Sequence, residues 1–191
     1  MWVLVTSVEP LSLWIFKETY LRFTSEDYDP SKLRNKFMHL TNASINVYNP
    51  AEKKVKKRGK YTITHNMWDR GEFQHYLSNE YAHLGDDPYT DKIEPQIKEG
   101  VLASLLAVKD QMVHRDRSHA LFGYDFMVDE DLNVWLIEVN CSPSMEYSSP
   151  TTERLCKQVL TELPRILLDG DHGREALDGP DTTGGFERIY N

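Results

Sequence analysis

Residues 122–145 read FGYDFMVDEDLNVWLIEVNCSPSM, two apolar segments joined by a short acidic turn. Segments rich in Val, Ile, Phe and Trp that flank such a turn are typical of paired β-strands. We therefore predict strands over residues 119–128 and 133–140. The apolar content of both segments also predicts a buried, central pair of strands, with the rest of the domain packed around it.

Polar side chains interrupt this predicted hairpin at regular positions. Side chains alternate between the two faces of a strand, so Glu138 and Asn140 share one face, while Ile137 and Val139 are expected to face a core. Antiparallel pairing around a turn centred between residues 131 and 132 sets Asp125 opposite Glu138, about 5 Å away. Two carboxylates and an amide oxygen should therefore converge on one patch.

Like charges that face each other across two strands cost free energy unless a cation bridges them. Oxygen ligands suit Mg²⁺, which takes one or two carboxylates and completes its octahedron with phosphate and water. The alternative is a solvated hairpin whose acidic residues lie on its wet face. Unpaired charge in buried strands is costly, which favours a Mg²⁺–nucleotide site with Asp125, Glu138 and Asn140 as metal ligands.

The composition of the 191 residues fits one globular domain. Hydrophobic residues make up 40% and charged residues 27%, which excludes collagen-like and low-complexity chains. No segment approaches the roughly 18 apolar residues of a membrane helix. The net charge of −8 disfavours a general nucleic-acid binder. Residues 1–16 lack the basic start of a signal peptide, so we expect an intracellular protein.

Hydrophobic periodicity predicts the other elements. We expect a hairpin of strands 2–8 and 11–17 and helices over 69–84, 91–113 and 151–168. A charged loop is expected over 49–60. Trp14, Trp68 and Trp135 are expected in the core. The chain after residue 168 reads as a surface tail, anchored by Phe186, Ile189 and Tyr190. The expected fold class is α+β, a mainly antiparallel sheet with packed helices.

Three segments together resemble the tubulin tyrosine ligase-like family. They are WVLVTSVEPLSLWIFKETYLRF at 2–23, HLTN at 39–42 and the hairpin at 122–145. Members of this family are ATP-grasp ligases that add amino acids to tubulin tails. NMWDRGEFQHYL at 66–77, ERLCKQV at 153–159 and GGFERIYN at 184–191 are most similar to the tubulin glycylase subgroup.

The resemblance implies a domain organisation and a role for each matching residue. Residues 1–168 would be the C-terminal part of an ATP-grasp core whose N-terminal part is missing, and residues 169–191 a partly packed tail. The implied cofactors are ATP and Mg²⁺. Asp125, Glu138 and Asn140 match the family's Mg²⁺ ligands, and Thr41 and Asn42 match residues that contact ATP. Arg22 matches the catalytic arginine that engages the carboxylate of the amino acid. Ala43 and Ser44 match residues that contact the amino acid.

The activity implied by the resemblance is ATP-dependent ligation of free glycine to glutamate side chains of tubulin C-terminal tails, through an acyl-phosphate. The expected setting is the cytoplasm, on the cytoskeleton or in the axoneme of a cilium or flagellum, with no nucleic-acid or membrane partner. Two alternatives remain open. One is a glutamate or tyrosine ligase of the same family. The other is a non-catalytic module that binds tubulin tails through the basic residues of AEKKVKKRGK at 51–60.

Overall fold

A five-stranded sheet forms the body of the protein. The computed structural model describes residues 1–49, 56–169 and 183–191. The strand order is β8-β7-β1-β2-β9, and each neighbouring pair is antiparallel. The strands are β1 (Trp2–Val8), β2 (Leu11–Phe16), β7 (Ala120–Val128), β8 (Val134–Asn140) and β9 (Phe186–Tyr190). The α+β class with a mainly antiparallel sheet is thereby confirmed.

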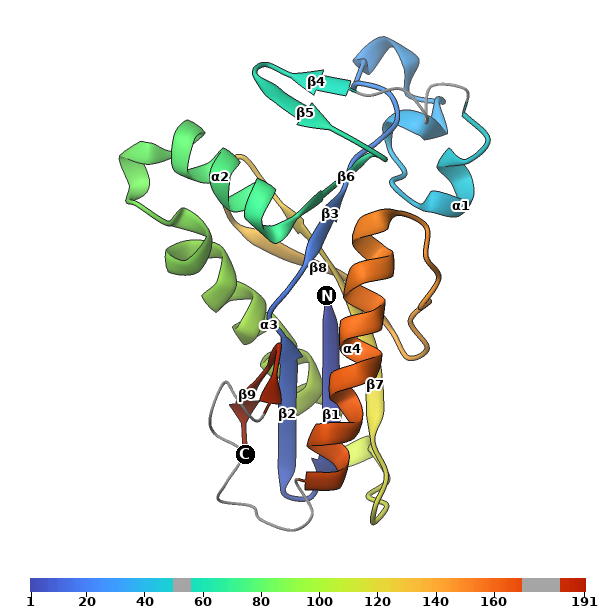
Figure 1. The fold of residues 1–191 in the computed structure, drawn as a ribbon, viewed down its shortest axis with the longest axis vertical. Coiled ribbons are helices and arrows are strands. Elements are labelled where there is room, and N and C mark those ends of the chain that lie inside the picture. Colours follow the sequence, from blue (N-terminus) through green and yellow to red (C-terminus); the bar gives the residue numbers. More distant parts are fainter. Residues whose placement is uncertain (50–55, 170–182) are drawn as a thin grey trace.

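Helices cover both faces of β1 and β2, which explains why these strands are apolar almost without alternation. On one face Trp2, Leu4, Trp14 and Phe16 pack against Leu155, Cys156, Val159 and Ile166 of α4 (Pro150–Asp169). On the other face Val3, Val5, Leu13 and Ile15 pack against Val101 and Leu105 of α3 (Glu94–Val108). Figure 1 shows α4 in front of β1 and α3 beside β2.

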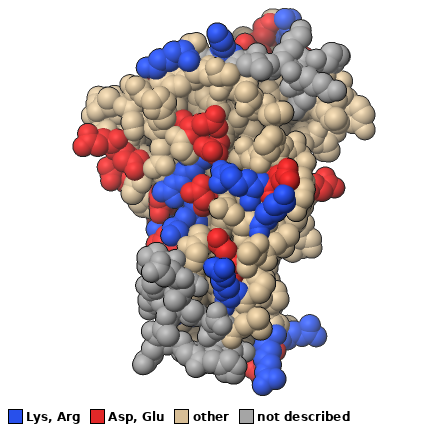
Figure 2. All heavy atoms as spheres, viewed as in Figure 1, with Lys and Arg blue, Asp and Glu red and all other residues tan. Residues whose placement is uncertain are grey.

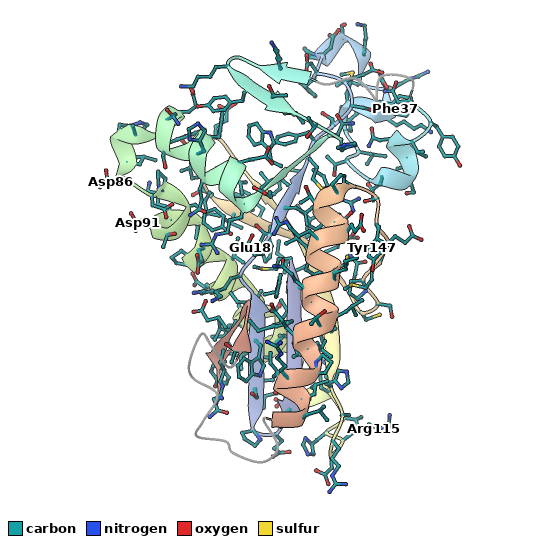
Figure 3. All side chains as sticks on the ribbon, viewed as in Figure 1. Glu18, Phe37, Asp86, Asp91, Arg115 and Tyr147 are labelled. Carbon is teal, nitrogen blue, oxygen red and sulfur yellow. The ribbon has the colours of Figure 1, made fainter. Side chains whose placement is uncertain are left out.

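A second group of elements extends from one end of the sheet (Figure 1). It comprises the paired strands β3 (Tyr20–Arg22) and β6 (Met67–Asp69), the hairpin of β4 (Lys56–Arg58) and β5 (Tyr61–Ile63), and the helices α1 (Ala43–Asn46) and α2 (Arg70–Glu80). Asp69 and Glu72 form a capping box, which explains why α2 begins directly after β6. In Figure 3, Glu18 lies where this group joins the sheet and Phe37 lies at its far end.

Short helical segments of other types complete the described chain. They are the 3₁₀ segments Pro30–Lys32, Lys36–Met38, Ala82–Leu84 and Lys109–Gln111, and the π-helical turn Tyr89–Ile93. The predicted helices 69–84 and 91–113 each contain one of the long helices and end in these tighter turns. Within the described residues, no helix is long and apolar enough to span a membrane.

Two sequence predictions about loops need correction. The predicted charged loop 49–60 contains β4, whose partner β5 follows directly, although residues 50–55 lie outside the described part. The predicted surface tail contains the strand β9, which pairs with β2, whereas its predicted anchoring by Phe186 is confirmed, because this side chain is 1% exposed. Three apolar residues among eight suffice for an edge strand, because β2 supplies the pairing and Phe16 the aromatic contact to Phe186.

Candidate metal and nucleotide site

The β7–β8 hairpin pairs as predicted at the position that matters most for the site. Asp125 lies opposite Glu138. The register then shifts by one residue, so that Phe126 pairs with Leu136 and Ile137 is the extra residue of a β-bulge. A bulge turns neighbouring side chains away from strict alternation, which the sequence pattern did not reveal.

The site lies on the same face of the sheet as helix α4. Leu121 packs against the α4 cluster, and alternation along β7 places Gly123 and Asp125 on that face as well. A Cβ atom on Gly123 would lie 2.9 Å from Cβ of Pro143. Glycine at this position therefore allows the segment after Asn140 to cross closely over β7.

The three predicted ligands lie together, although Asn140 turns its amide nitrogen, not the predicted oxygen, toward the two carboxylates. Nδ2 of Asn140 lies 3.4 Å from Oδ2 of Asp125 and 3.3 Å from Oε1 of Glu138, and donates to both. Rotation of the amide by half a turn would instead direct its oxygen toward the same centre. Two carboxylates and one amide thus surround a point at the surface of the sheet.

The surroundings of Asp125 disfavour its negative charge. Partial burial raises the pKa of Asp125 above its ordinary value, and the neighbouring Glu138 raises it further. The N-terminal ammonium of Met1 opposes these effects most strongly and the guanidinium of Arg22 to a smaller extent, and both lower the pKa of Asp125. Arg22 therefore lies close enough to act electrostatically on the carboxylate pair, although it belongs to β3. A divalent cation would relieve the same repulsion directly.

Beside the carboxylates lies an exposed apolar surface, which contradicts the prediction of a buried hairpin. Met127, Trp135 and Ile137 are 60%, 59% and 58% exposed. The prediction that Ile137 and Val139 face a core is therefore wrong, as is the core position of Trp135, whereas Trp14 and Trp68 are buried. The reason is that β8 is the edge strand of the sheet.

The turn of the hairpin fixes the exposed tryptophan. Nε1 of Trp135 donates to Oδ2 of Asp129 at 3.0 Å, and the backbone and side chain of Asn133 donate to the same carboxylate. These hydrogen bonds lower the pKa of Asp129. The ring of Trp135 thus presents a large aromatic surface to solvent in a defined orientation.

Arg22 occupies the last position of β3, paired with Met67 of β6. Its guanidinium lies 5.4 Å from the ring centre of Tyr20, and Nη2 lies 3.4 Å from the hydroxyl of Tyr20. Tyr20 in turn packs against Trp2 at a ring separation of 6.0 Å. The arginine is thus supported by an aromatic side chain that is anchored on the sheet.

The predicted contacts Thr41, Asn42, Ala43 and Ser44 lie on a separate segment, at the start of α1. Asn42 is the N-cap residue of this four-residue helix, and Thr41, Asn42 and Ser44 are exposed. Their predicted contacts with ATP and the amino acid stay predictions. Asn46, which holds this segment by its side chain, was not among the predicted site residues. An asparagine at the end of HLTNASIN was the available signal.

The donor set fits Mg²⁺ better than a transition metal. Among the described residues, no group of three or more His, Cys, Asp or Glu side chains is placed to hold a metal ion. The candidate site consists of two carboxylates and one amide, all oxygen donors, and its surface position leaves room for phosphate and water ligands. Histidine or cysteine would be expected for zinc.

Comparison with known proteins identifies the family. Residues 1–172 match the model of the tubulin-tyrosine ligase family. Tubulin glycylase 3C of Tetrahymena thermophila is 42% identical over 193 residues, which covers 99% of this chain and 17% of that protein. Tubulin glycylase 3A of Drosophila melanogaster is 33% identical over 192 residues, with 99% and 18% covered. Tubulin monoglycylase TTLL3 of Danio rerio is 34% identical over 190 residues, with 99% and 23% covered.

The chain therefore spans less than a quarter of the length of these curated relatives. The family model matches most of the chain, and the β7–β8 hairpin with its three oxygen-bearing side chains lies within the matched residues. This chain belongs to the tubulin-tyrosine ligase family.

Proposed function

We propose that the chain carries the metal-binding and amino-acid-binding part of an ATP-dependent ligase that adds glycine to glutamate side chains of tubulin C-terminal tails through an acyl-phosphate. The convergence of Asp125, Glu138 and Asn140 on one face of the β7–β8 hairpin carries this proposal. The proposed cofactors are ATP and Mg²⁺, and the proposed architecture is the C-terminal portion of an ATP-grasp core in residues 1–168, with residues 169–191 as its tail.

The three side chains would hold Mg²⁺ through oxygen atoms. When bound, Mg²⁺-ATP supplies the phosphoryl group and neutralises negative charge on the transferred phosphate. The raised pKa of Asp125 supports this role, because the carboxylate pair has repulsion that a cation would offset. No protein nucleophile is required, so Cys141, although exposed and next to Asn140, has no covalent role.

The exposed surface of Met127, Trp135 and Ile137 supports nucleotide binding next to these ligands. Apolar side chains in such numbers are unusual on a solvent-exposed strand, and a large exposed apolar surface commonly marks a binding site. The flat ring of Trp135, held by Asp129, offers a stacking surface for a planar base. We propose that the base lies on this surface, with its phosphates directed toward Asp125.

Arg22 suits the carboxylate of the incoming amino acid. Its guanidinium presents two parallel N–H donors, which match a carboxylate better than a lysine does. Proximity to Asp125 would place that amino acid near the metal. Thr41 and Asn42 are proposed to contact ATP, and Ala43 and Ser44 the amino acid, with the small side chain of Ala43 compatible with glycine.

The names of the relatives support tubulin as the acceptor and glycylation as the reaction. We extend both to this chain as part of the proposal. The proposed setting is accordingly the cytoplasmic cytoskeleton, including the axoneme of a cilium or flagellum, with tubulin or microtubules as the partner and free glycine as the donor.

Incubation with tubulin, Mg²⁺-ATP and labelled glycine, glutamate or tyrosine tests the activity and the donor together. Glycine alone should be incorporated. Asp125→Ala and Glu138→Ala should abolish incorporation, whereas Asp131→Ala, which removes an exposed carboxylate at the turn of the same hairpin, should leave it unchanged. Incorporation of glutamate or tyrosine would establish the alternative donor, and equal activity of all variants would refute the proposed metal site.

A second candidate function is a non-catalytic module that binds acidic tubulin tails. The hairpin of β4 and β5 favours it, because Lys57 and Lys60 are exposed there, and Figure 2 shows separate Lys and Arg side chains at this end of the molecule. Such binding would weaken steeply with salt. Salt-sensitive cosedimentation with microtubules, without incorporation of any amino acid, would favour this function over the ligase.

A further inference from the structure

We propose that Asn46 is a positioning residue that, together with Ser25, fixes the segment Thr41–Ser44 relative to Arg22. The inference rests on the proposed function, in which these two parts of the chain bind the substrates of one reaction. It concerns side chains that touch neither ATP nor glycine and that act through the backbone of the segment they hold.

Asn46 holds the backbone on both sides of Thr41. Its Nδ2 atom donates to the carbonyl of Leu40 at 2.8 Å and to the carbonyl of Asn42 at 3.0 Å. Its Oδ1 atom accepts a hydrogen bond from the hydroxyl of Ser25. One side chain therefore joins the loop of Thr41 and Asn42 to the strand segment that contains Arg22.

Ser25 forms the other half of this connection. It follows Arg22, the last residue of β3, by three residues and lies in a bend of the chain. Its hydroxyl donates to Asn46 and accepts from Nδ2 of Asn49 at 2.9 Å. The nearby backbone N–H of Phe23 donates to the carbonyl of Asn66, which anchors the same segment to the turn before β6.

Burial makes these hydrogen bonds specific. Ser25 and Asn46 are each 1% exposed, and Asn49 is 6% exposed. A buried amide that loses its partner pays the full desolvation penalty, so this arrangement of donors and acceptors is strongly favoured over displaced ones. Surface hydrogen bonds could not fix the loop in this way, because water would replace them at little cost.

The segment also needs external support. Helix α1 has only four residues, and so short a helix is not stable by itself. The exposure of Thr41, Asn42 and Ser44 means that packing contributes little to their placement. The hydrogen bonds of Asn46 therefore determine where the proposed substrate contacts lie with respect to Arg22.

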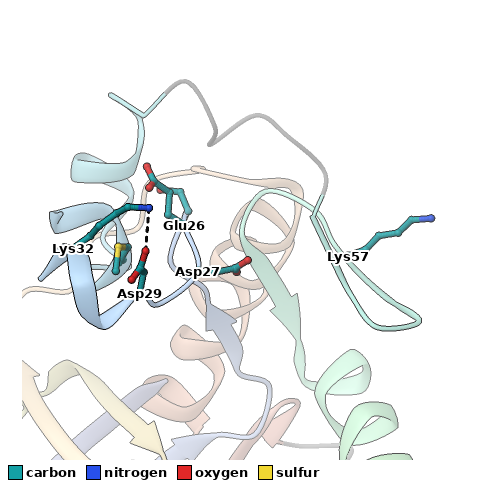
Figure 4. A pocket seen from close by; sticks show the side chains of 7 residues that line it. Glu26, Asp27, Asp29, Lys32 and Lys57 are labelled. Carbon is teal, nitrogen blue, oxygen red and sulfur yellow. Dashed lines mark ion pairs between the residues drawn. The ribbon is translucent and has the colours of Figure 1, made fainter.

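The surroundings of Ser25 are charged, and Asn49 joins the two, because its Nδ2 atom donates both to Ser25 and to Glu26. Glu26 accepts from Asn35 at 2.7 Å and from Asn49 at 3.0 Å, and it lines an open cavity of about 450 Å³. Figure 4 shows Asp29 paired with Lys32 in this cavity, at 3.0 Å. Because Glu26 and the Asp29–Lys32 pair already have partners, substitution of Ser25 removes a neutral link and leaves these charges in place.

Ser25→Ala tests the inference, because it removes the link to β3 and keeps both bonds from Asn46 to the loop. Ser31→Ala is the matched control, since Ser31 donates to exposed Asp29 in the same part of the chain. Glycine incorporation into tubulin is measured at varied glycine and Mg²⁺-ATP. Displacement of the loop should raise the KM for glycine about tenfold in Ser25→Ala. Asn46→Ala should raise it further, and Ser31→Ala should match wild type.

The KM distinguishes positioning from a general structural role. A variant that only unfolds more readily has fewer active molecules, which lowers kcat and leaves the KM unchanged. A folded Ser25→Ala protein with an unchanged KM for both substrates would overturn the inference.

Failure of the proposed function would look different, because wild type itself would incorporate no glycine. Hydrogen exchange then tests the connection alone. The amides of Ile45, Asn46 and Val47 are hydrogen-bonded to Asn42 and Ala43 in α1. They should exchange faster in Ser25→Ala than in wild type and Ser31→Ala. Equal exchange in the three proteins would overturn the inference.

Discussion

Strands β1 and β8 belong to the same sheet and have similarly apolar sequences, yet their surroundings are opposite. Val3 and Leu4 of β1 are fully buried between α3 and α4, whereas Trp135 and Ile137 of β8 are more than half exposed. The strand order places β1 at the centre of the sheet and β8 at its edge. An apolar sequence thus predicts a strand, but burial depends on what covers that strand.

This contrast bears directly on function. Residues 2–5 of β1 are buried in the core, and the open surface of β8 lies beside Asp125 and Glu138. Natural edge strands usually avoid exposed apolar side chains, because they invite aggregation. In the proposed function, the nucleotide covers these exposed apolar side chains beside the carboxylate pair.

The largest expected effect is a difference in protein stability between a substitution in β1 and one in β8. Leu4→Ala should lower the free energy of unfolding by about 2–5 kcal/mol, because it leaves a cavity in a closed core. Ile137→Ala should change it by less than about 0.5 kcal/mol. Denaturant unfolding of both variants is the measurement. Comparable losses would show that β8 is also covered in solution.

A smaller effect is expected where the chain crosses β7 closely. Gly123→Ala should cost about 1–3 kcal/mol, because the new Cβ would lie 2.9 Å from Pro143 and displace the segment after Asn140. The matched control is Gly71→Ala, whose Cβ meets only Oδ1 of Asp69 at 3.4 Å, within helix α2. This control should be neutral or stabilising by up to about 1 kcal/mol. Equal thermal stabilities of the two variants would contradict the close crossing.

Much of the fold follows from the sequence for reasons visible at particular residues. Strong apolar runs predict β1 and β2, and the 3.6-residue spacing of Ile97, Val101 and Leu105 predicts α3. Strand β9 was missed because its apolar residues are few and its pairing with β2 is distant in sequence. The burial of β8 was misjudged because strand order is not contained in a local pattern.

In the candidate site, too, contacts between residues close in sequence could be predicted, whereas more distant ones could not. Asp125 and Glu138 could be paired from the turn between them, since that contact is local in sequence. The bulge at Ile137 could not be predicted, because it depends on how β7 and β8 twist together. The connection from Ser25 to Asn46 spans 21 residues and was equally invisible to periodicity.

Substitution of the exposed Trp135 should have an intermediate effect, on nucleotide binding and not on stability. Trp135→Ala should weaken Mg²⁺-ATP binding about fivefold to tenfold, or about 1 kcal/mol, by removing a stacking surface. Unfolding should be nearly unchanged, because the ring is mostly exposed. Titration calorimetry measures the affinity, and Val113→Ala, at another highly exposed apolar residue, is the control. Unchanged affinity in Trp135→Ala would place the base elsewhere.

The smallest expected effect concerns pH. The pKa of Asp125 is raised above 3.8, so the folded protein binds this proton more readily than the unfolded chain. The contribution of Asp125 to the free energy of unfolding therefore falls as pH rises above 3.8. Near pH 7 the ionised carboxylate destabilises the folded protein to its full extent. Asp125→Asn removes this destabilising charge and should raise Tm at pH 7 by at most about 2 °C, since the carboxylate is partly exposed. The difference should vanish at about pH 3, where the carboxyl is protonated in both states; a lower Tm of Asp125→Asn at pH 7 would contradict this.

The most direct test of the proposed site is a calorimetric titration of Mg²⁺-ATP into the wild-type chain and into Glu138→Gln, with Asp131→Asn as the control for lost charge on the same hairpin. The proposal predicts saturable binding to wild type and Asp131→Asn, and binding weakened at least about tenfold in Glu138→Gln. Equal affinity of the three proteins, or binding to wild type that does not depend on Mg²⁺, would contradict a metal–nucleotide site at Asp125, Glu138 and Asn140.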